Sequence, residues 1–428
     1  MARLLFVLPL ALAAAVSLPI AGPLAAQQAS GTRSLSGTLP SGAKWVAQVP
    51  AVWNGTLLLW SRGYSPTAGS PEAAGRGMHQ QLLDAGYAIA GSDYGAGGWA
   101  LAEAVPAQRA TIAAFAAAHG TPKRVIAWGY SMGGLVSTAL AEEPKPAIDG
   151  ALAMCASIGG AVGMMNMALD GAYAFRTLVA PDAGIRLVEV DDDRANGKRV
   201  NDALAVAMTT AEGRARVALA GVLGGIPGWT SRDRPEPAAS DVEAQVDEIG
   251  RSFTMGIFLP RTDQEARAGG VFSWNEGIDY RKQLARSGRR AMIEGLYRKA
   301  GLDLDAELAR LNAGQRVAAK PDAVDYMVRN YTPNARPGVP LLAVQTVGDG
   351  LTSPSLQHGY AEAARGDVKS VYVRGAGHCT FAPEAVIASI RFLDARLEQG
   401  KWGKSPALFV PYTPPPMLRP FVRGREGR

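Results

Sequence analysis

Short apolar runs alternate with helix-compatible stretches through the first third of this 428-residue chain. Apolar runs of this length, bounded by turn residues, predict buried strands joined by helices. Strands are expected at 43–49, 56–60, 87–91, 125–128 and 148–155, and helices at 70–85, 107–118 and 134–142. The helix at 70–85 is predicted to begin with a serine cap, a proline and an acid at Ser70, Pro71 and Glu72. The pattern is typical of an α/β architecture with a doubly wound, mostly parallel sheet.

The alternation stops between 157 and 336 and then returns. This stretch shows helical patterning without a convincing strand, and its clearest helices are expected at 201–223, 289–300, 303–312 and 322–330. Beyond it, strands at 340–347 and 369–374 alternate with helices at 353–366 and 383–399. We therefore expect a core built from 27–156 and 337–399, interrupted by a helical insertion at 157–336.

The chain begins with a pattern typical of a secretory signal peptide over 1–26. Arg3 supplies the positive charge, 4–20 is almost wholly apolar, and small residues at 23–26 offer a cleavage site. The prediction is an exported protein, periplasmic or extracellular. An uncleaved membrane anchor is the alternative, but three prolines in the segment disfavour a spanning helix. No later segment is apolar over enough residues to span a bilayer, so no stable membrane insertion is expected after cleavage.

Charge argues against a nucleic-acid partner, although the formal net charge is +6. Residues 399–428 carry six basic side chains and one acidic one, a net of +5, so the rest of the chain is nearly neutral. No basic stripe with interleaved aromatic residues is present. The segment 400–428 is also rich in proline, and we expect an extended tail on the surface.

A G-x-S-x-G pentapeptide, Gly129-Tyr130-Ser131-Met132-Gly133, lies between the strand at 125–128 and the helix at 134–142. A strand that turns sharply into a helix leaves the serine on a strained corner, and glycines on both sides relieve crowding. Backbone N–H groups at the start of the helix can stabilise a developing oxyanion. We interpret Ser131 as a nucleophile; a chance turn is the alternative.

The order of strand, G-x-S-x-G turn, helix, strand, helical insertion, strand, helix, strand and helix resembles the α/β-hydrolase fold over 42–156 and 337–399. The resemblance implies helices on both faces of the sheet and an insertion that caps the serine. Within that superfamily the chain looks most like exported bacterial serine esterases with a large helical cap. The family's oxyanion hole implies the backbone N–H groups of Met132 and Tyr64. Many members have His-Gly before the latter, where this chain has Arg62-Gly63.

A serine hydroxyl needs a base, and the base needs an acid that orients it. The order in α/β-hydrolases is serine, acid, histidine. Of four histidines, His79 and His119 precede the serine and His358 lies inside a predicted helix. His378 lies in a loop after the last strand, where the family places its base, and is therefore the predicted base.

The acid is expected at the end of the strand 340–347, where Asp349 stands between two glycines. A carboxylate there can hold the second N–H of the imidazole. An ordinary Asp-Gly turn has the same local sequence and is the alternative. Asp93 is a second candidate, but it precedes the serine and is interpreted as structural.

Both cysteines map to the same edge of the predicted sheet. Cys155 ends the strand beside the nucleophile strand, and Cys379 directly follows His378. In an oxidising compartment a disulfide between them is expected, and it would tether the histidine loop. Two free thiols are the alternative.

Neither a metal nor a cofactor is expected, because H-x-x-E-H, C-x-x-C and Walker patterns are absent from the sequence. Four methionines follow or end the strand beside the nucleophile: Met154, Met164, Met165 and Met167. They are candidates for an adaptable acyl pocket, although ordinary core packing is the favoured interpretation.

These patterns predict an exported serine hydrolase that cleaves small or medium organic carboxylic esters through an acyl-enzyme. A serine aminopeptidase of the same fold is the first alternative. Such a peptidase often needs an acidic group in the insertion to hold the substrate amine. The candidates for that group are Glu243, Glu248, Asp263 and Glu265. A non-catalytic binding protein on a hydrolase scaffold is the second alternative.

Overall fold

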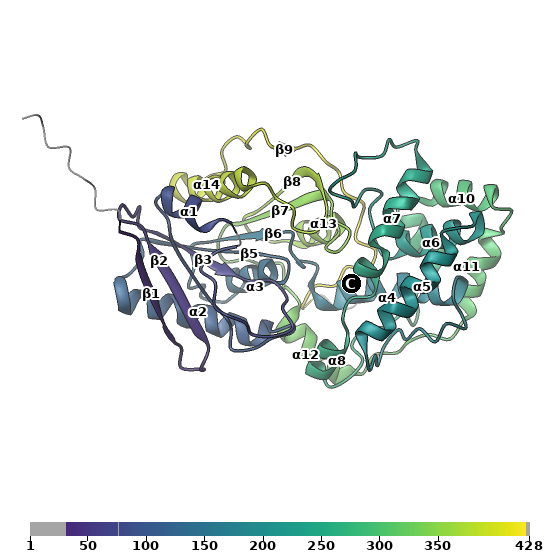
Figure 1. The fold of residues 1–428 in the computed structure, drawn as a ribbon, viewed down its shortest axis with the longest axis horizontal. Helices are drawn as coiled ribbons and strands as arrows, with labels where there is room; N and C mark the ends of the chain where they lie inside the picture. Colours follow the sequence, from purple (N-terminus) through teal and green to yellow (C-terminus); the bar gives the residue numbers. More distant parts are fainter. Residues whose placement is uncertain (1–30, 76, 425–428) are drawn as a thin grey trace, which may run out of the picture. The chain divides into compact units, whose positions relative to one another are not determined.

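The computed structural model describes residues 31–75 and 77–424 (Figure 1). The predicted signal peptide, 1–26, lies outside the described residues. Within them, the strands form one nine-stranded sheet in the order β1-β2-β4-β3-β5-β6-β7-β8-β9. Their bounds are β1 (Arg33–Thr38), β2 (Lys44–Val49), β3 (Thr56–Ser61), β4 (Ala88–Ser92), β5 (Arg124–Tyr130), β6 (Gly150–Met154), β7 (Leu341–Gly348), β8 (Val368–Ala376) and β9 (Phe409–Val410).

The centre of the sheet, from β4 to β8, is parallel throughout, and the strands β1, β2 and β9 pair antiparallel at its two edges. The central strands β3, β5, β6 and β7 are buried along most or all of their length, as expected for parallel strands covered on both faces. With the strand–turn–helix at the end of β5, this order is that of the α/β-hydrolase fold, and it confirms the fold predicted from the sequence.

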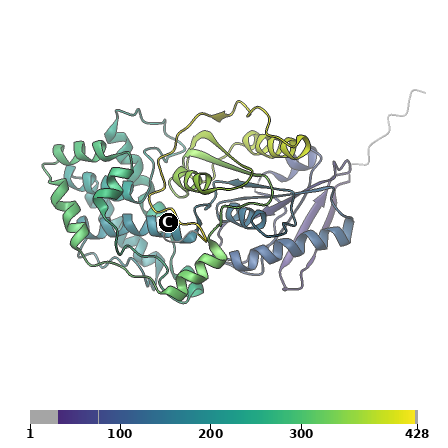
Figure 2. The same cartoon turned by 180° about the vertical axis from the view of Figure 1, so that it is seen from behind.

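Helices cover both faces of the sheet (Figures 1 and 2). Their bounds are α1 (His79–Asp84), α2 (Leu101–His119), α3 (Met132–Ala141), α13 (Pro354–Ala363) and α14 (Pro383–Gln399). On one face of the sheet, side chains of α1 and α14 pack with the strand residues that point to that face, including Leu58 and Ile126. Side chains of α2, α3 and α13 pack with the alternate set, including Leu57 and Ala127. The alternation follows from the two-residue period of a strand.

The chain between β6 and β7 is helical, and it has an apolar core of its own. Its helices are α4 (Gly160–Leu178), α5 (Asp193–Ala207), α6 (Ala211–Leu223), α7 (Val242–Ile257), α8 (Thr262–Ala268), α9 (Tyr280–Arg286), α10 (Arg290–Lys299), α11 (Leu304–Ala313) and α12 (Pro321–Tyr331). Figure 1 shows most of them gathered beside one end of the sheet. None of the described helices combines the length and apolarity that crossing a bilayer requires.

The helix expected at 70–85 is wrong over its first half, because α1 begins only at His79. Gly75 and Gly77 interrupt the segment, and Gly77 adopts a positive φ of 77°. A Cβ at Gly75 would lie 3.1 Å from the Trp60 ring, so the segment instead packs closely against β3. Tertiary contact therefore overrides the helix-start signal of Ser70, Pro71 and Glu72.

Two further helix predictions need correction. The helix expected at 201–223 is two helices, α5 and α6, because Thr210 interrupts it and accepts a hydrogen bond from the Gly213 N–H as an N-cap. Helix α2 begins at Leu101 rather than at 107 and carries Pro106 in its interior. The long helix α4 lies in the stretch that shows helical patterning, but it is not among the helices predicted by range. It is buried on nearly every side, so it has no polar face to reveal a helical period.

The C-terminal segment is not solvated along its whole length. Strand β9 pairs with β8, and Met417, Leu418 and Arg419 are buried. The Arg419 Nη1 lies 2.9 Å from both carboxylate oxygens of Asp170 on α4, and its Nη2 donates to the Trp274 carbonyl. The tail is thus anchored in the helical insertion by a buried ion pair.

This pair predicts a pH-dependent stability defect. Burial raises the pKa of Asp170 to about 6, and the adjacent Arg419 acts in the opposite direction. Without the arginine, the carboxylate binds its proton still more tightly in the folded protein. Replacement Arg419→Met should therefore lower the free energy of unfolding by about 3–5 kcal/mol at about pH 8, and by less at about pH 5, where Asp170 is protonated.

Denaturant unfolding at the two pH values measures the defect. The double variant Arg419→Met/Asp170→Asn is the matched control, and it should regain stability at the higher pH because no buried charge remains. Equal stability of Arg419→Met and the unmodified protein at the higher pH would show that the pair does not anchor the tail.

Candidate active site

Ser131 stands at the corner between β5 and α3 with a φ of 57° and a ψ of −123°. A non-glycine residue in this region of backbone space is strained and is held there by its surroundings. A Cβ on Gly129 would lie 2.5 Å from the Ser61 carbonyl oxygen, and a Cβ on Gly133 would overlap the same oxygen. Both glycines are therefore required by the close approach of β3, which is the physical reason for the G-x-S-x-G pattern.

The backbone of Ser131 is tied to the end of β6. Its N–H donates to the Met154 carbonyl at 3.1 Å, and its carbonyl accepts from the Ser157 N–H at 3.2 Å. Cys155 lies between these two partners. The nucleophile candidate is thereby fixed to the segment that carries one of the two cysteines.

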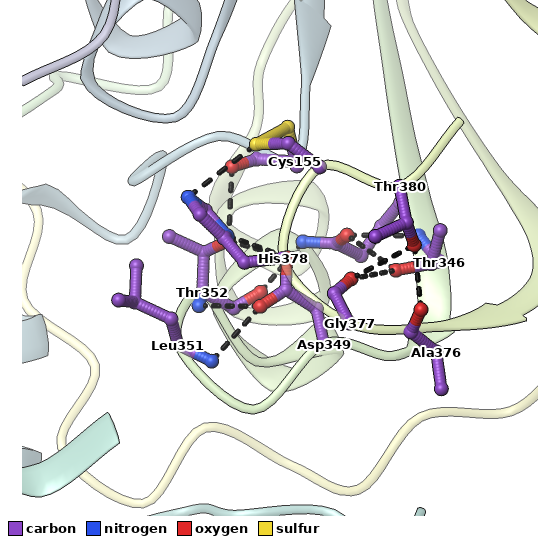
Figure 3. A network of polar contacts seen from close by, with 11 residues as sticks. Cys155, Thr346, Asp349, Leu351, Thr352, Ala376, Gly377, His378 and Thr380 are labelled. Carbon is purple, nitrogen blue, oxygen red and sulfur yellow. Dashed lines mark hydrogen bonds and ion pairs between the residues drawn. A yellow bond between two sulfur atoms is a disulfide. The ribbon is translucent and has the colours of Figure 1, made fainter. Parts of the chain in front are cut away.

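Asp349 follows β7, is fully buried, and has donors around both of its oxygens (Figure 3). Its Oδ1 accepts from the N–H groups of Leu351 and Thr352, each at 2.9 Å. Its Oδ2 accepts from the Thr352 hydroxyl at 2.9 Å and lies 2.9 Å from the His378 Nδ1. The residue therefore forms the local turn that was the alternative interpretation, and it contacts the predicted base as well.

His378 lies in the loop after β8, with its side chain 22% exposed. Its Nδ1 faces Asp349, while its Nε2 lies 3.4 Å from the Cys379 sulfur. Within the described part of the chain, no hydrogen bond joins His378 to the Ser131 hydroxyl. The structure thus brings the predicted acid and base together and leaves the predicted contact between serine and histidine unmade.

Cys155 and Cys379 form a disulfide, with their Cα atoms 5.3 Å apart. This confirms the predicted pairing over the two free thiols. Both residues adopt a positive φ, 42° and 56°. Since the Cys155 carbonyl oxygen lies 2.9 Å from the Thr352 hydroxyl oxygen, the disulfide residue contacts the acid loop as well as the histidine loop. Thr352 was missed by the sequence reasoning, and no local pattern marks it.

Arg62 is buried and braces the loop beside the serine. It donates to the carbonyls of Gly63, Asp93 and Ala96 at 3.1, 3.1 and 2.5 Å, and its guanidinium lies 4.5 Å from the Tyr94 ring centre. Burial lowers the pKa of Arg62. Its neighbour Gly63 passes so close that an added Cβ would lie 3.6 Å from the Ser131 Cβ. The Arg62–Gly63 segment therefore runs directly against the nucleophile.

The oxyanion donors expected at Met132 and Tyr64 lie on the two segments that meet at Ser131. Met132 is the first residue of α3, and Tyr64 directly follows Gly63. Their roles stay predictions. Asp93, the second acid candidate, accepts from the backbone N–H groups of Lys44 and Gly95, each at 2.9 Å. It is thus engaged in holding two loops.

The other three histidines have structural surroundings. His79 is the first residue of α1, and His119 ends α2, where its ring packs on Trp53. His358 lies in α13 with its Nε2 3.4 Å from Glu362. The four methionines near the end of β6 are buried among core side chains, in agreement with the favoured interpretation.

The helical insertion packs directly on the acid loop. A Cβ on Gly350 would overlap the Ser252 side chain of α7, and a Cβ on Gly348 would lie 2.7 Å from the Trp229 carbonyl oxygen. Glu248 of α7, which is almost fully buried, accepts from the N–H groups of Thr230 and Ser231 at 2.8 and 2.7 Å. The segment after Trp229 is thereby held to α7.

Each of the four carboxylates considered for holding a substrate amine already has a partner in the protein. Glu243 and Glu265 form ion pairs with arginine side chains, and Glu248 and Asp263 accept from backbone N–H groups. In the described residues, no group of three or more His, Cys, Asp or Glu side chains is arranged to hold a metal ion.

No family model matches the chain. Over 405 residues it is 28% identical to an o-phthalyl amidase of Xanthobacter agilis, an alignment that covers 86% of this chain and 87% of that protein. Among solved structures, an esterase of Pyrococcus furiosus is similar with a TM-score of 0.40 and 12% identity, over 87% of this chain and 91% of the other. A proline iminopeptidase of Mycobacterium smegmatis has a TM-score of 0.40 and 14% identity, over 86% of this chain and 100% of the other.

The disulfide closes a loop of more than 200 residues, so its loss should destabilise the protein. The separation of 224 residues predicts that the variant Cys155→Ala/Cys379→Ala loses about 2–4 kcal/mol of unfolding free energy, chiefly because its unfolded chain is less constrained. Denaturant unfolding measures the difference. Dithiothreitol should destabilise the unmodified protein to the same extent and leave the variant unchanged. A variant as stable as the unmodified protein would contradict the expectation.

Proposed function

We propose that this α/β-hydrolase-fold protein is an exported serine hydrolase that cleaves carboxylic esters through an acyl-enzyme. The observation that carries the proposal is the strained Ser131 at the end of β5, together with the contact between Asp349 and His378. The Cys155–Cys379 disulfide links these residues at the same edge of the sheet. A nucleophile held at a sharp strand-to-helix turn and a buried carboxylate on the Nδ1 of a histidine are the parts of a serine triad.

In the proposed reaction, the Ser131 Oγ attacks the acyl carbonyl carbon while the His378 Nε2 takes the hydroxyl proton. The imidazole must turn from the Cys379 sulfur toward the serine for this step. Asp349 holds the Nδ1–H and stabilises the imidazolium. The N–H groups of Met132 and Tyr64 stabilise the oxyanion. The tetrahedral adduct collapses, His378 protonates the leaving alcohol, and water then hydrolyses the acyl-enzyme by the same steps.

Amide hydrolysis is the second candidate, because the similarity to an amidase extends over 86% of this chain. The chemistry is the same until the tetrahedral adduct, where His378 must protonate a leaving nitrogen instead of an oxygen. The aminopeptidase alternative has less support, since all four candidate carboxylates in the insertion already have partners. Export is supported by the predicted signal peptide and by the disulfide.

A fluorophosphonate should label Ser131 selectively, because the reagent reacts with activated serine hydroxyls. Peptide mass mapping of the labelled protein should find the adduct on the peptide containing Ser131, and Ser131→Ala should take up no label. Ser157, whose N–H donates to the Ser131 carbonyl, is the matched control. Ser157→Ala should remain labelled. Label retained in Ser131→Ala would refute the assignment. An unlabelled protein that also turns over no ester would favour a non-catalytic scaffold.

Matched substrates should separate the ester and amide proposals. We expect turnover of p-nitrophenyl esters and, if the second candidate holds, of p-nitroanilides of the same acids, including the phthalyl group. Ser131→Ala should lower kcat on either by roughly 10⁴-fold or more. Release of p-nitrophenol or p-nitroaniline is measured by absorbance. Turnover confined to anilides with a free α-amine would favour the aminopeptidase instead.

A further inference from the structure

Thr352 contacts both the predicted acid and the predicted base, and no pattern in the sequence indicates these contacts. It is fully buried, and its hydroxyl oxygen lies 2.9 Å from the Asp349 Oδ2, 3.2 Å from the His378 Nδ1 and 2.9 Å from the Cys155 carbonyl oxygen. Its backbone N–H donates to the other carboxylate oxygen of Asp349 at 2.9 Å. Figure 3 shows its side chain beside both His378 and Asp349.

The hydroxyl has one proton and two lone pairs for these three neighbours. Two of the neighbours, the Asp349 carboxylate and the Cys155 carbonyl, only accept hydrogen bonds, so the hydroxyl proton goes to one of them. The remaining neighbour, the His378 Nδ1, also lies 2.9 Å from the Asp349 Oδ2, which only accepts, so the Nδ1 carries its own proton. The opposite tautomer would place an unprotonated nitrogen 2.9 Å from the carboxylate, with lone pair facing lone pair.

The position of this hydroxyl is itself fixed. The Thr352 carbonyl accepts from the side chain of Gln345, a buried residue of β7, at 2.6 Å. The next residue, Ser353, is the N-cap of α13. Thr352 is therefore held between a central strand and a helix start, and it has little freedom to follow movements of the histidine loop.

We propose that Thr352 is a positioning residue, whose hydroxyl supports the Nδ1–H tautomer that the Asp349 carboxylate imposes on His378 and ties the acid and the base to the disulfide residue Cys155. The inference rests on the proposed function and names one more residue of the same site. The Nδ1–H tautomer leaves the lone pair on Nε2, the atom that must accept the serine proton.

The test compares Thr352→Val, which keeps the shape and removes the hydroxyl, with Thr352→Ser, which keeps the hydroxyl. We expect kcat for ester hydrolysis to fall roughly 10- to 100-fold in Thr352→Val with KM nearly unchanged, because a misplaced base slows the chemical step. Thr352→Ser should recover most of that rate. Thr111→Val is the matched control, since the hydroxyl of this buried threonine donates to the Ala107 carbonyl within α2 at 2.9 Å, outside the acid and histidine loops.

Proton NMR supplies a readout that does not depend on turnover. The low-field resonance of the His378 Nδ1–H, assigned by its loss in His378→Gln, should be present in the unmodified protein, Thr352→Ser and Thr111→Val. It should be shifted or broadened in Thr352→Val. Where Thr352→Val fails to fold, Thr352→Ala takes its place in the comparison with Thr352→Ser.

Two outcomes would overturn the proposal. One is a Thr352→Val protein with unchanged kcat and an unchanged resonance, which would reduce Thr352 to packing. The other is an equal loss of rate in Thr352→Val and Thr352→Ser, which would exclude a role of the hydroxyl. A resonance that depends on the hydroxyl in a protein without ester or amide turnover would support the positioning role while refuting the proposed function.

Discussion

Cys155 connects the three segments that carry the candidate triad. Its sulfur is bonded to Cys379 beside the predicted base, and its carbonyl oxygen contacts the Thr352 hydroxyl in the acid loop. Its own N–H donates to the Val344 carbonyl of β7, and the residue before it holds the backbone of Ser131. The disulfide and these contacts thus set the relative positions of serine, acid and base. Disturbing this one residue would therefore affect all three at once.

The strained backbone at the edge of the sheet that carries the candidate triad, where the parallel strands end, is held in place by the packing of the strands beneath it. Ser131, Cys155 and Cys379 all adopt positive φ without being glycine, a cost of about 1–3 kcal/mol for each residue. Each is compensated by contacts that a relaxed backbone would lose. Ser131 is held by the approach of Ser61 to Gly133, and the two cysteines are held by the bond between them. The central parallel strands, which are almost wholly buried, provide the rigid support.

The sequence was sufficient where a local pattern reflects a local constraint. The G-x-S-x-G turn, the helix at 383–399 and the cysteine pairing were predicted because each depends on neighbours in sequence or on chain order. The predicted start of α1 is wrong because the close packing of Gly75 against Trp60 determines the local backbone. Helix α4 has no polar face, so it shows no helical period. Arg419 and Thr352 depend on partners far away in the chain, and no spacing along the sequence reveals them.

The distinction between ester and amide substrates depends on the histidine more than on the serine. An alcohol leaves a tetrahedral adduct readily, whereas an amine must be protonated before it leaves, so the second task of the base is more demanding for amides. On the proposed mechanism, that proton comes from the Nε2 of His378, whose Nδ1 contacts the Asp349 carboxylate and the Thr352 hydroxyl and whose next residue, Cys379, forms the disulfide. On the proposed mechanism, a loosened imidazole therefore reduces amide cleavage more than cleavage of an activated ester.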